Sequence, residues 1–470
     1  MPALSVGQRS LWTLYRLAPE SAAYNDADGL AFAPPPDEAA LRAALRDLVS
    51  RHDLLRSVFR DTGDGTGHGT GSEAGPDAGP GTVVREVRDP GLVELEVRDV
   101  PGGGDDPRAA LRTEVRAVAA EPLDLAGRGP LRAVLLRRPS DAVLVLVCHH
   151  IAGDATSQRI IWRDLLELYR ARTAGGAPRL PELRSTYDAF TAAERELVGS
   201  TRGDDLARFW RAECAGARAA ELPTSRPRPD VPEFRGATRA RALGAALSGR
   251  VRDAARGRGI TPFALLLGAF QALLHRHAGD GDLLVGCPTT LRRGLATRDL
   301  VGLLVNTVPL RSAADPSATF GEAAAQAAAR LAAASRRARY PFALMDGGRG
   351  RPPALRVGIT LVGASTDPLL SRAASGGWSE HAGHRIAVLD LPRLEGQNDL
   401  TVEIGAAADG FSVAFRYDVA LFTPGAVDRL LDRYVRFAGL AADEPDARPA
   451  RVPLAEDAGE IARLLALGSG

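Results

Sequence analysis

One short segment carries most of the side chains that could do acid–base chemistry. It is Cys148–Ser157, with the sequence CHHIAGDATS, and it follows five consecutive apolar residues, 143–147. An apolar run of this kind is typical of a strand that is buried on both faces. Because adjacent residues leaving a strand point to opposite sides, we expect one histidine to face the interior and the other to face a cleft.

A histidine at the end of a strand is well placed to accept a proton at neutral pH. The plainer alternative is a hydrogen-bonded polar residue with no chemical role. A metal site is not expected, because adjacent histidines rarely bind one ion and no Cys/His pair at ligand spacing lies nearby. The chain has no GxSxG segment, and Cys148 belongs to a predicted buried strand. The segment therefore offers no activated nucleophile of either kind.

The elements around this segment mix helices and strands. We predict a strand at Ala142–Cys148, a helix at Ser157–Ala174 and one interrupted helix at Tyr187–Cys214. The segment Asp61–Thr82, rich in Gly, Thr, Pro and Asp, is expected to be a flexible loop within a hairpin. His381 and His384 are expected in a loop that crosses between lobes.

A Gly- and Pro-rich stretch, Gly175–Leu183, separates one helix from the next and suggests a division into two lobes. We expect an N-terminal lobe at residues 1–176, a C-terminal lobe at 177–455 and the start of a linker at 456–470.

Composition excludes several classes of protein. The 59 basic residues are all arginine and face 58 acidic ones, so a net charge of +1 argues against a nucleic-acid partner. The absence of lysine excludes Schiff-base and pyridoxal chemistry. Three scattered cysteines favour a reducing, cytoplasmic compartment. We expect neither a signal peptide nor a membrane span.

The segment His149–Ala155 resembles the HHxxxDG signature of nonribosomal peptide synthetase condensation domains, which belong to the chloramphenicol-acetyltransferase-like superfamily. Other segments resemble motifs of that family, in the family's order and along almost the whole chain. They are Ser5–Leu14, Arg51–Phe59, Tyr187–Phe190, Gly286–Pro288 with Arg292, Val301–Arg311, Tyr340–Phe342, Asn398–Leu400 and Arg451–Leu454.

The resemblance implies an α+β fold. Two chloramphenicol-acetyltransferase-like lobes would form a V-shaped pseudo-dimer, each lobe a mixed sheet with flanking helices, with the active site in the tunnel between them. The resemblance also implies a monomeric enzyme of antibiotic biosynthesis that works without a cofactor of its own. Phosphopantetheine arms of upstream and downstream carrier proteins would bring the substrates.

The implied reaction joins a carrier-bound acyl or peptidyl thioester to an amine or hydroxyl acceptor, forming an amide or an ester. His150, the second histidine of the signature, would be the catalytic residue. His149, Asp154, Ala155 and Arg292 would be structural residues of the motif, with Asp154 paired to Arg292 across the lobes. The residues expected to line the substrate tunnel are Gly153, Ser157 and Asn306.

Two departures keep other functions open. Ala155 replaces the signature glycine, and at a positive φ it would cost about 1 kcal/mol. Thr156 replaces a frequent tryptophan. The alternatives are a free-standing O-acyltransferase of the polyketide-associated type and an inactive domain that recruits partner enzymes.

Overall fold

The computed structural model describes residues 3–62, 83–100, 107–229, 235–279, 281–347, 350–363, 377–389, 391, 398–407 and 410–454. Two sequence expectations lie outside these residues. They are the loop Asp61–Thr82, apart from its first two residues, and the linker at 456–470.

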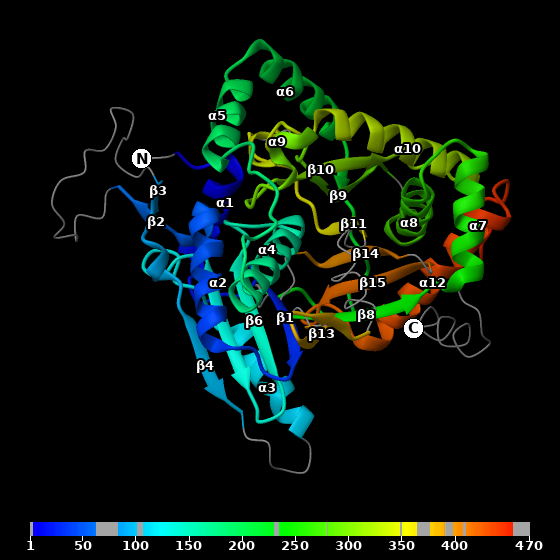
Figure 1. The fold of residues 1–470 in the computed structure, drawn as a ribbon. Helices are drawn as coiled ribbons and strands as arrows, with labels where there is room; N and C mark the ends of the chain where they lie inside the picture. The colour runs from blue at the N-terminus through cyan, green and yellow to red at the C-terminus, as the bar shows by residue number, and fades with distance from the viewer. Residues whose placement is uncertain are drawn as a thin grey trace.

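The N-terminal lobe is built on a six-stranded sheet in the order β12-β13-β1-β6-β5-β4 (Figure 1). Only β4 and β5 run parallel, so the sheet is mixed. Helices α2 and α4 pack against each other, and α3 contacts β1, β5 and β6. The strands are β1 (Asn25–Ala33), β4 (Leu95–Asp99), β5 (Leu131–Arg137), β6 (Ala142–His149), β12 (Ser379–His381) and β13 (His384–Leu389). The helices are α1 (Val6–Leu17), α2 (Glu38–Arg51), α3 (Pro107–Ala120) and α4 (Ala155–Ala174).

The strand and helix predicted on either side of the histidines are both present. Every residue of β6 is buried, as the apolar run requires of a central strand. Helix α4 buries Ile161, Leu165 and Leu168, one stripe at helical spacing. The region predicted as one interrupted helix is two helices, α5 (Tyr187–Val198) and α6 (Thr201–Cys214).

The C-terminal lobe has its own mixed sheet, in the order β10-β9-β11-β14-β15-β8, with the short β7 beside β9. Helix α8 lies against α7, α10 and α12, and most of it is buried. The strands are β7 (Arg218–Ala219), β8 (Gly236–Ala242), β9 (Leu283–Thr290), β10 (Val305–Ser312), β11 (Val357–Gly363), β14 (Leu400–Ala407) and β15 (Gly410–Asp418). The helices are α7 (Gly244–Gly257), α8 (Pro262–Ala278), α9 (Gly294–Arg298), α10 (Phe320–Arg337) and α12 (Pro424–Asp443).

One hairpin from the second half of the chain belongs to the sheet of the N-terminal lobe. Strands β12 and β13 come from the second half of the chain, yet β13 pairs antiparallel with β1 in the N-terminal sheet, from Gly29 opposite Leu389 to Ala33 opposite Arg385. The loop expected at His381 and His384 is wrong, because both residues belong to this hairpin. The lobe boundary at residue 176 stays a prediction.

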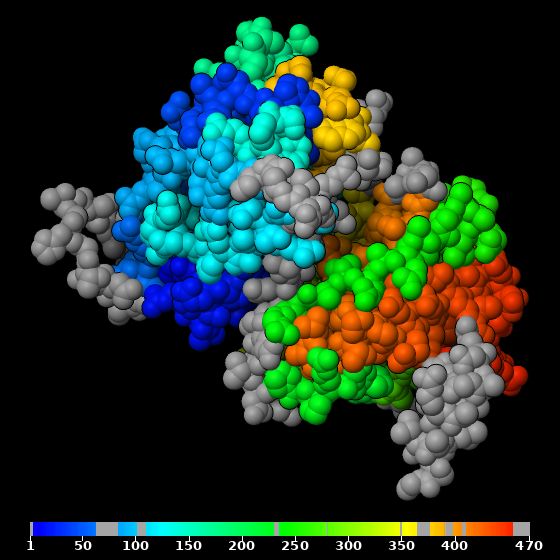
Figure 2. Space-filling model, turned by 90° about the horizontal axis from the view of Figure 1, so that it is seen from below, coloured from blue at the N-terminus to red at the C-terminus, as the bar shows by residue number. Residues whose placement is uncertain are grey.

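The architecture is that of two lobes, each with a mixed sheet and flanking helices. In Figure 2 the blue and cyan residues form one mass with a group of green and a group of yellow residues at its top, and the orange and red residues with further green ones form another. Within the described part of the chain, no single helix has the length and hydropathy of a membrane span. Only α7 and α8, bent by 101° at the break between them, pass such a test when taken together.

Candidate active site between the lobes

The two histidines occupy opposite environments, as the strand geometry predicts. His149 is the last residue of β6 and is 4% exposed, and its Nδ1 accepts a hydrogen bond from the Ile151 amide at 3.0 Å. Burial, with a smaller contribution from the neighbouring His150, lowers the pKa of His149 to about 3. His149 is therefore a neutral interior residue at neutral pH.

His150 lies on the wall of a cavity of about 960 Å³ that both lobes line, and its side chain is 20% exposed. The His150 amide donates to the Tyr24 carbonyl at 2.8 Å, which fixes the start of the turn. Its ring Nδ1 is 3.2 Å from the Gly153 carbonyl oxygen, and its Nε2 is 3.2 Å from Asp26 Oδ2. The ring is thus held from both sides at the edge of the cavity.

Helix α1 supports this turn from outside. Ser5 and Gln8 form a capping box at its start, and the Gln8 side-chain amide donates to the Ile151 carbonyl at 2.9 Å. Gln8 is fully buried. The first motif of the chain therefore holds the backbone beside the histidines.

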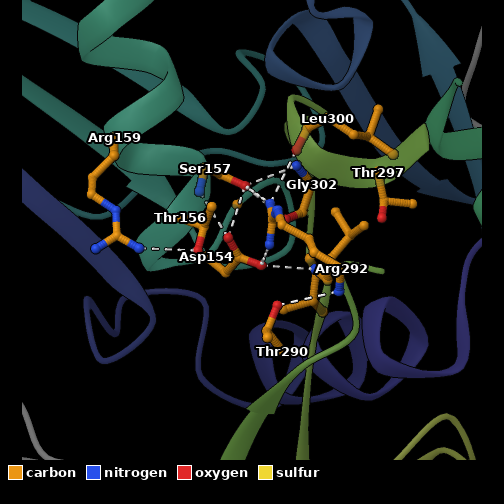
Figure 3. Close-up of polar contacts among 12 residues, drawn as sticks. Asp154, Thr156, Ser157, Arg159, Thr290, Arg292, Thr297, Leu300 and Gly302 are labelled. Carbon is orange, nitrogen blue, oxygen red and sulfur yellow. Dashed lines mark hydrogen bonds and ion pairs between the residues drawn. The ribbon is translucent and has the colours of Figure 1, made fainter. Parts of the chain in front are cut away.

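Asp154 joins the two lobes (Figure 3). It caps α4, because its Oδ1 accepts from the Ser157 amide at 2.8 Å and from the Ser157 hydroxyl at 3.0 Å. Its Oδ2 accepts from Arg292 Nη1 at 2.5 Å and from the Leu304 amide at 3.0 Å. The ion pair predicted from the sequence is present, and both side chains are less than a tenth exposed.

Ser157 extends this network across the interface. The single proton of its hydroxyl is shared between Asp154 Oδ1 and the Gly302 carbonyl, the latter at 2.9 Å. The hydroxyl oxygen accepts from the Gly302 amide at 3.0 Å and from Arg292 Nη2 at 2.9 Å. Arg292 Nη2 also donates to the Leu300 carbonyl at 3.0 Å. A Cβ on Gly302 would lie 2.3 Å from the Tyr187 ring, so glycine is needed at this close approach.

The three expected tunnel residues have different places. Asn306 lines the cavity, but neither Gly153 nor Ser157 does. Ser157 is fully buried and belongs to the interlobe network instead. Gly153 is also buried, and its carbonyl faces the His150 ring.

The Asn306 side chain also joins β10 to the segment 338–342 by hydrogen bonds. Its side-chain amide donates to the carbonyls of Ala338 and Tyr340, both at 2.7 Å, and its oxygen accepts from the Phe342 amide at 3.0 Å. Asn306 lies in β10, so it holds the Tyr340–Phe342 motif against the edge of the C-terminal sheet.

Ala155 carries no backbone strain. It is the first residue of α4, and Ala382 is the one non-glycine residue with a positive φ in the described part of the chain. The Ala155 side chain is exposed on the cavity wall. The cost that alanine would have at a positive φ therefore does not arise.

The remaining candidates for chemistry are the cysteine thiols and groups of side chains that could bind a metal. Burial raises the pKa of Cys214 to about 11 and that of Cys287 to about 12, and it raises that of Cys148 further. These thiols stay protonated at neutral pH. Across the described ranges, no group of three His, Cys, Asp or Glu side chains is placed to hold a metal ion.

Asp26 was not predicted from the sequence as a site residue. It lies on β1, a strand that was not predicted, because Asn-Asp-Ala-Asp-Gly is a poor strand sequence. The available signal was a pair of acidic residues, Asp26 and Asp28, at strand spacing just before an apolar stretch.

Comparison with known proteins identifies the family. The model of the condensation domain matches residues 1–462. Phosphinothricin tripeptide synthetase PhsC from Streptomyces viridochromogenes is 31% identical over 467 residues, which cover 96% of this chain and 40% of that protein. The chain thus spans well under half the length of the synthetases it matches.

Solved structures agree in fold. The X-domain from teicoplanin biosynthesis superimposes with a TM-score of 0.81 at 24% identity, over 96% of this chain and 97% of that one. SgcC5 from Streptomyces globisporus, in a complex with 1-(2-naphthyl)-1,2-ethanediol and sucrose, has a TM-score of 0.73 at 26% identity, covering 95% of this chain and all of that one. The predicted pair of chloramphenicol-acetyltransferase-like lobes is confirmed. The chain belongs to the condensation-domain family of nonribosomal peptide synthetases.

Proposed function

We propose that this chain catalyses acyl transfer from a carrier-bound thioester to an amine acceptor, with amide formation, and that His150 moves the proton. The observation that carries the proposal is the His150 ring on the wall of the interlobe cavity. A cavity of about 960 Å³ has room for the ends of two substrate arms.

The reaction balances without a covalent enzyme intermediate. The acceptor nitrogen forms a bond to the thioester carbon, and the carbon–sulfur bond then breaks. The nitrogen loses a proton to His150 Nε2, and the leaving sulfur takes that proton. General base catalysis of this kind contributes about 10²–10⁴-fold, and holding both reactants in register supplies much of the rest.

The other motif residues support His150 indirectly. His149 keeps the turn in place from the interior, and Asp154 with Arg292 sets the position of one lobe against the other. The substrates would arrive on phosphopantetheine arms of upstream and downstream carrier proteins. The free, buried cysteines suit the cytoplasm as the site of action.

Ester formation is the second candidate. SgcC5, a relative 26% identical to this chain, was crystallised with a diol, which places a hydroxyl compound on a protein of this fold. A hydroxyl acceptor could use the same His150, and it needs its proton removed more than an amine does.

The test is a product assay with the purified chain. A carrier protein loaded with an acyl thioester is incubated with aminoacyl carriers, free amines and free diols, and the products are weighed by mass spectrometry. We expect amide products with the parent and with His381→Gln, a control outside the cavity, and far less of them with His150→Gln. A parent that forms neither amide nor ester would reject the enzyme and favour the recruitment function.

A further inference from the structure

Polar side chains gather on one face of the C-terminal sheet, inside the interlobe cavity. In the sheet, Thr360 of β11 is paired with Glu403 of β14, and Thr401 of β14 is paired with Arg416 of β15, so the four residues form two neighbouring rows. Asn398 lies just before β14, and all five residues line the cavity. We call these five residues the polar patch.

The opposite face of the same strands is the core of the lobe. Ile359, Val402 and Phe415 alternate with the patch residues along β11, β14 and β15, and all three are fully buried in that core. A sheet with one apolar face and one polar face usually presents the polar face to water. Here the polar face meets the cavity that both lobes line, so its groups are offered to whatever fills the cavity.

The other end of the cavity is apolar. It adjoins β10, which is the first strand in the order of this sheet, whereas β14 and β15 follow after β9 and β11. The Phe342–Leu344 turn contacts both β10 and helix α1 there. The apolar lining at this end comes from Leu11, Phe190, Leu303 and Phe342. One end of the cavity thus suits an apolar group and the other end a polar one.

The polar patch has hydrogen-bonding capacity to spare. Among the described residues, the Thr360 hydroxyl has no hydrogen-bond partner. Asn398 Nδ2 donates to Thr401 Oγ1 at 3.2 Å, which leaves the Thr401 hydroxyl proton and the Asn398 oxygen for a substrate. Arg416 Nη2 is 2.6 Å from Glu403 Oε2, so the two charges of the patch offset each other.

We propose that the polar patch is a specificity site for an uncharged polar side chain of a substrate, a carboxamide or a hydroxyl. This inference rests on the proposed function. A carboxamide brings both N–H donors and an acceptor oxygen, which match the Thr360 and Thr401 hydroxyls and the Asn398 oxygen. An alkyl group of the same size would displace water from these groups without replacing its hydrogen bonds. A carboxylate brings acceptors alone and would meet the Glu403 charge.

The first test uses three side chains of nearly the same size. Asparaginyl, leucyl and aspartyl groups are offered in turn as the carrier-bound donor and as the acceptor thioester of N-acetylcysteamine, each time with one fixed partner substrate. In one of these two positions, kcat/KM for asparaginyl should exceed that for leucyl and for aspartyl by about tenfold or more. A parent with no such preference in either position would overturn the inference.

Isosteric variants locate the preference. The double variant Thr360→Val with Thr401→Val replaces two hydroxyls by methyl groups, so its asparaginyl-to-leucyl ratio should fall about tenfold. Thr307→Val is the matched control, because Thr307 lines the same cavity on β10, away from the patch, and its variant should keep the parental ratio. Thermal melting checks the fold of each variant. An unchanged ratio in the folded double variant, or an equal loss in Thr307→Val, would overturn the inference.

A binding measurement separates this inference from the proposed function. The methyl signals of Thr360 and Thr401, assigned with the single valine variants, are followed by NMR while asparaginamide or leucinamide is added. Asparaginamide should shift both signals at concentrations where leucinamide shifts neither. Such shifts in a parent that forms no product would support the patch and reject the proposed function. A parent that forms product but shows no shifts, or equal shifts with leucinamide, would overturn the role of the patch.

Discussion

Two adjacent histidines differ in role because a strand ends between them. His149 completes β6 and points into the lobe, whereas His150 begins the turn and reaches the cavity. Their contacts follow from this. His149 accepts from a neighbouring amide and lies near the rings of Tyr15 and Tyr24, while His150 lies between a carbonyl and a carboxylate.

At the residue scale, His149 should make stability depend on pH. Its pKa is about 3 in the folded chain and about 6.5 in an unfolded one, so between these values only the unfolded state binds the proton. Stability therefore falls as the pH drops below about 6.5, by about 1.4 kcal/mol per pH unit from this group.

His149→Asn removes the titrating group and keeps an acceptor oxygen near the position of Nδ1. The loss of unfolding free energy between pH 6.5 and 5, measured by urea denaturation, should be smaller in this variant by about 2 kcal/mol. His52, His275 and His277, whose pKa values burial also lowers, still contribute in both proteins. Identical pH dependence in the two proteins would show that His149 is not buried as a neutral ring.

At the element scale, the start of α4 serves as both a helix cap and a joint between lobes. Asp154→Ala removes the cap and leaves Arg292 without its carboxylate, so we expect a loss of about 3–5 kcal/mol in unfolding free energy. Asp154→Asn retains a capping oxygen and should be less destabilising by about 1 kcal/mol. If Asp154→Ala unfolds at the same urea concentration as the parent, the joint has no energetic role.

The turn that contains Gly302 should not tolerate a methyl group. Gly302→Ala places a Cβ against the buried Tyr187 ring, and we expect a loss of about 1–3 kcal/mol. Gly249→Ala is the matched control, because its Cβ meets open space within α7 and should stabilise the helix by about 0.5–1 kcal/mol. Similar melting temperatures for the two variants would mean that the turn can move away from Tyr187.

The local sequence pattern was enough to predict some of these elements but not others. The apolar run of β6 and the stripe of α4 are periodic signals that packing alone explains, so both were predictable. Strand β1 has no such signal at its start. Its pairing with β6 imposes the extended form on Asn25–Gly29, and Asp26 was missed with it.

At the scale of the whole molecule, the N-terminal sheet depends on the second half of the chain. Strand β13 covers the edge of β1 through five paired residues. The pairing of β13 with β1 could not be foreseen, because register between distant segments has no local signature.

A chain cut after residue 176 should therefore fold poorly. It would expose the β1 edge and the surfaces that meet the other lobe, so we expect aggregation and no cooperative melting. Circular dichroism melts and size-exclusion chromatography of residues 1–176, beside the full chain, provide the measurement. A monomeric fragment with a sharp transition would show that the lobe is independent of the β12–β13 hairpin.

In the proposed reaction, His150 moves the proton during an acyl transfer between the lobes. The most direct measurement is the single-turnover rate of amide formation from a carrier-bound acyl thioester and an aminoacyl acceptor, for the parent and for His150→Gln. We expect a rate about 10²-fold lower or more in His150→Gln, with an unchanged melting temperature because the ring lies at the cavity edge. A folded His150→Gln variant that forms amide at the parental rate would contradict it.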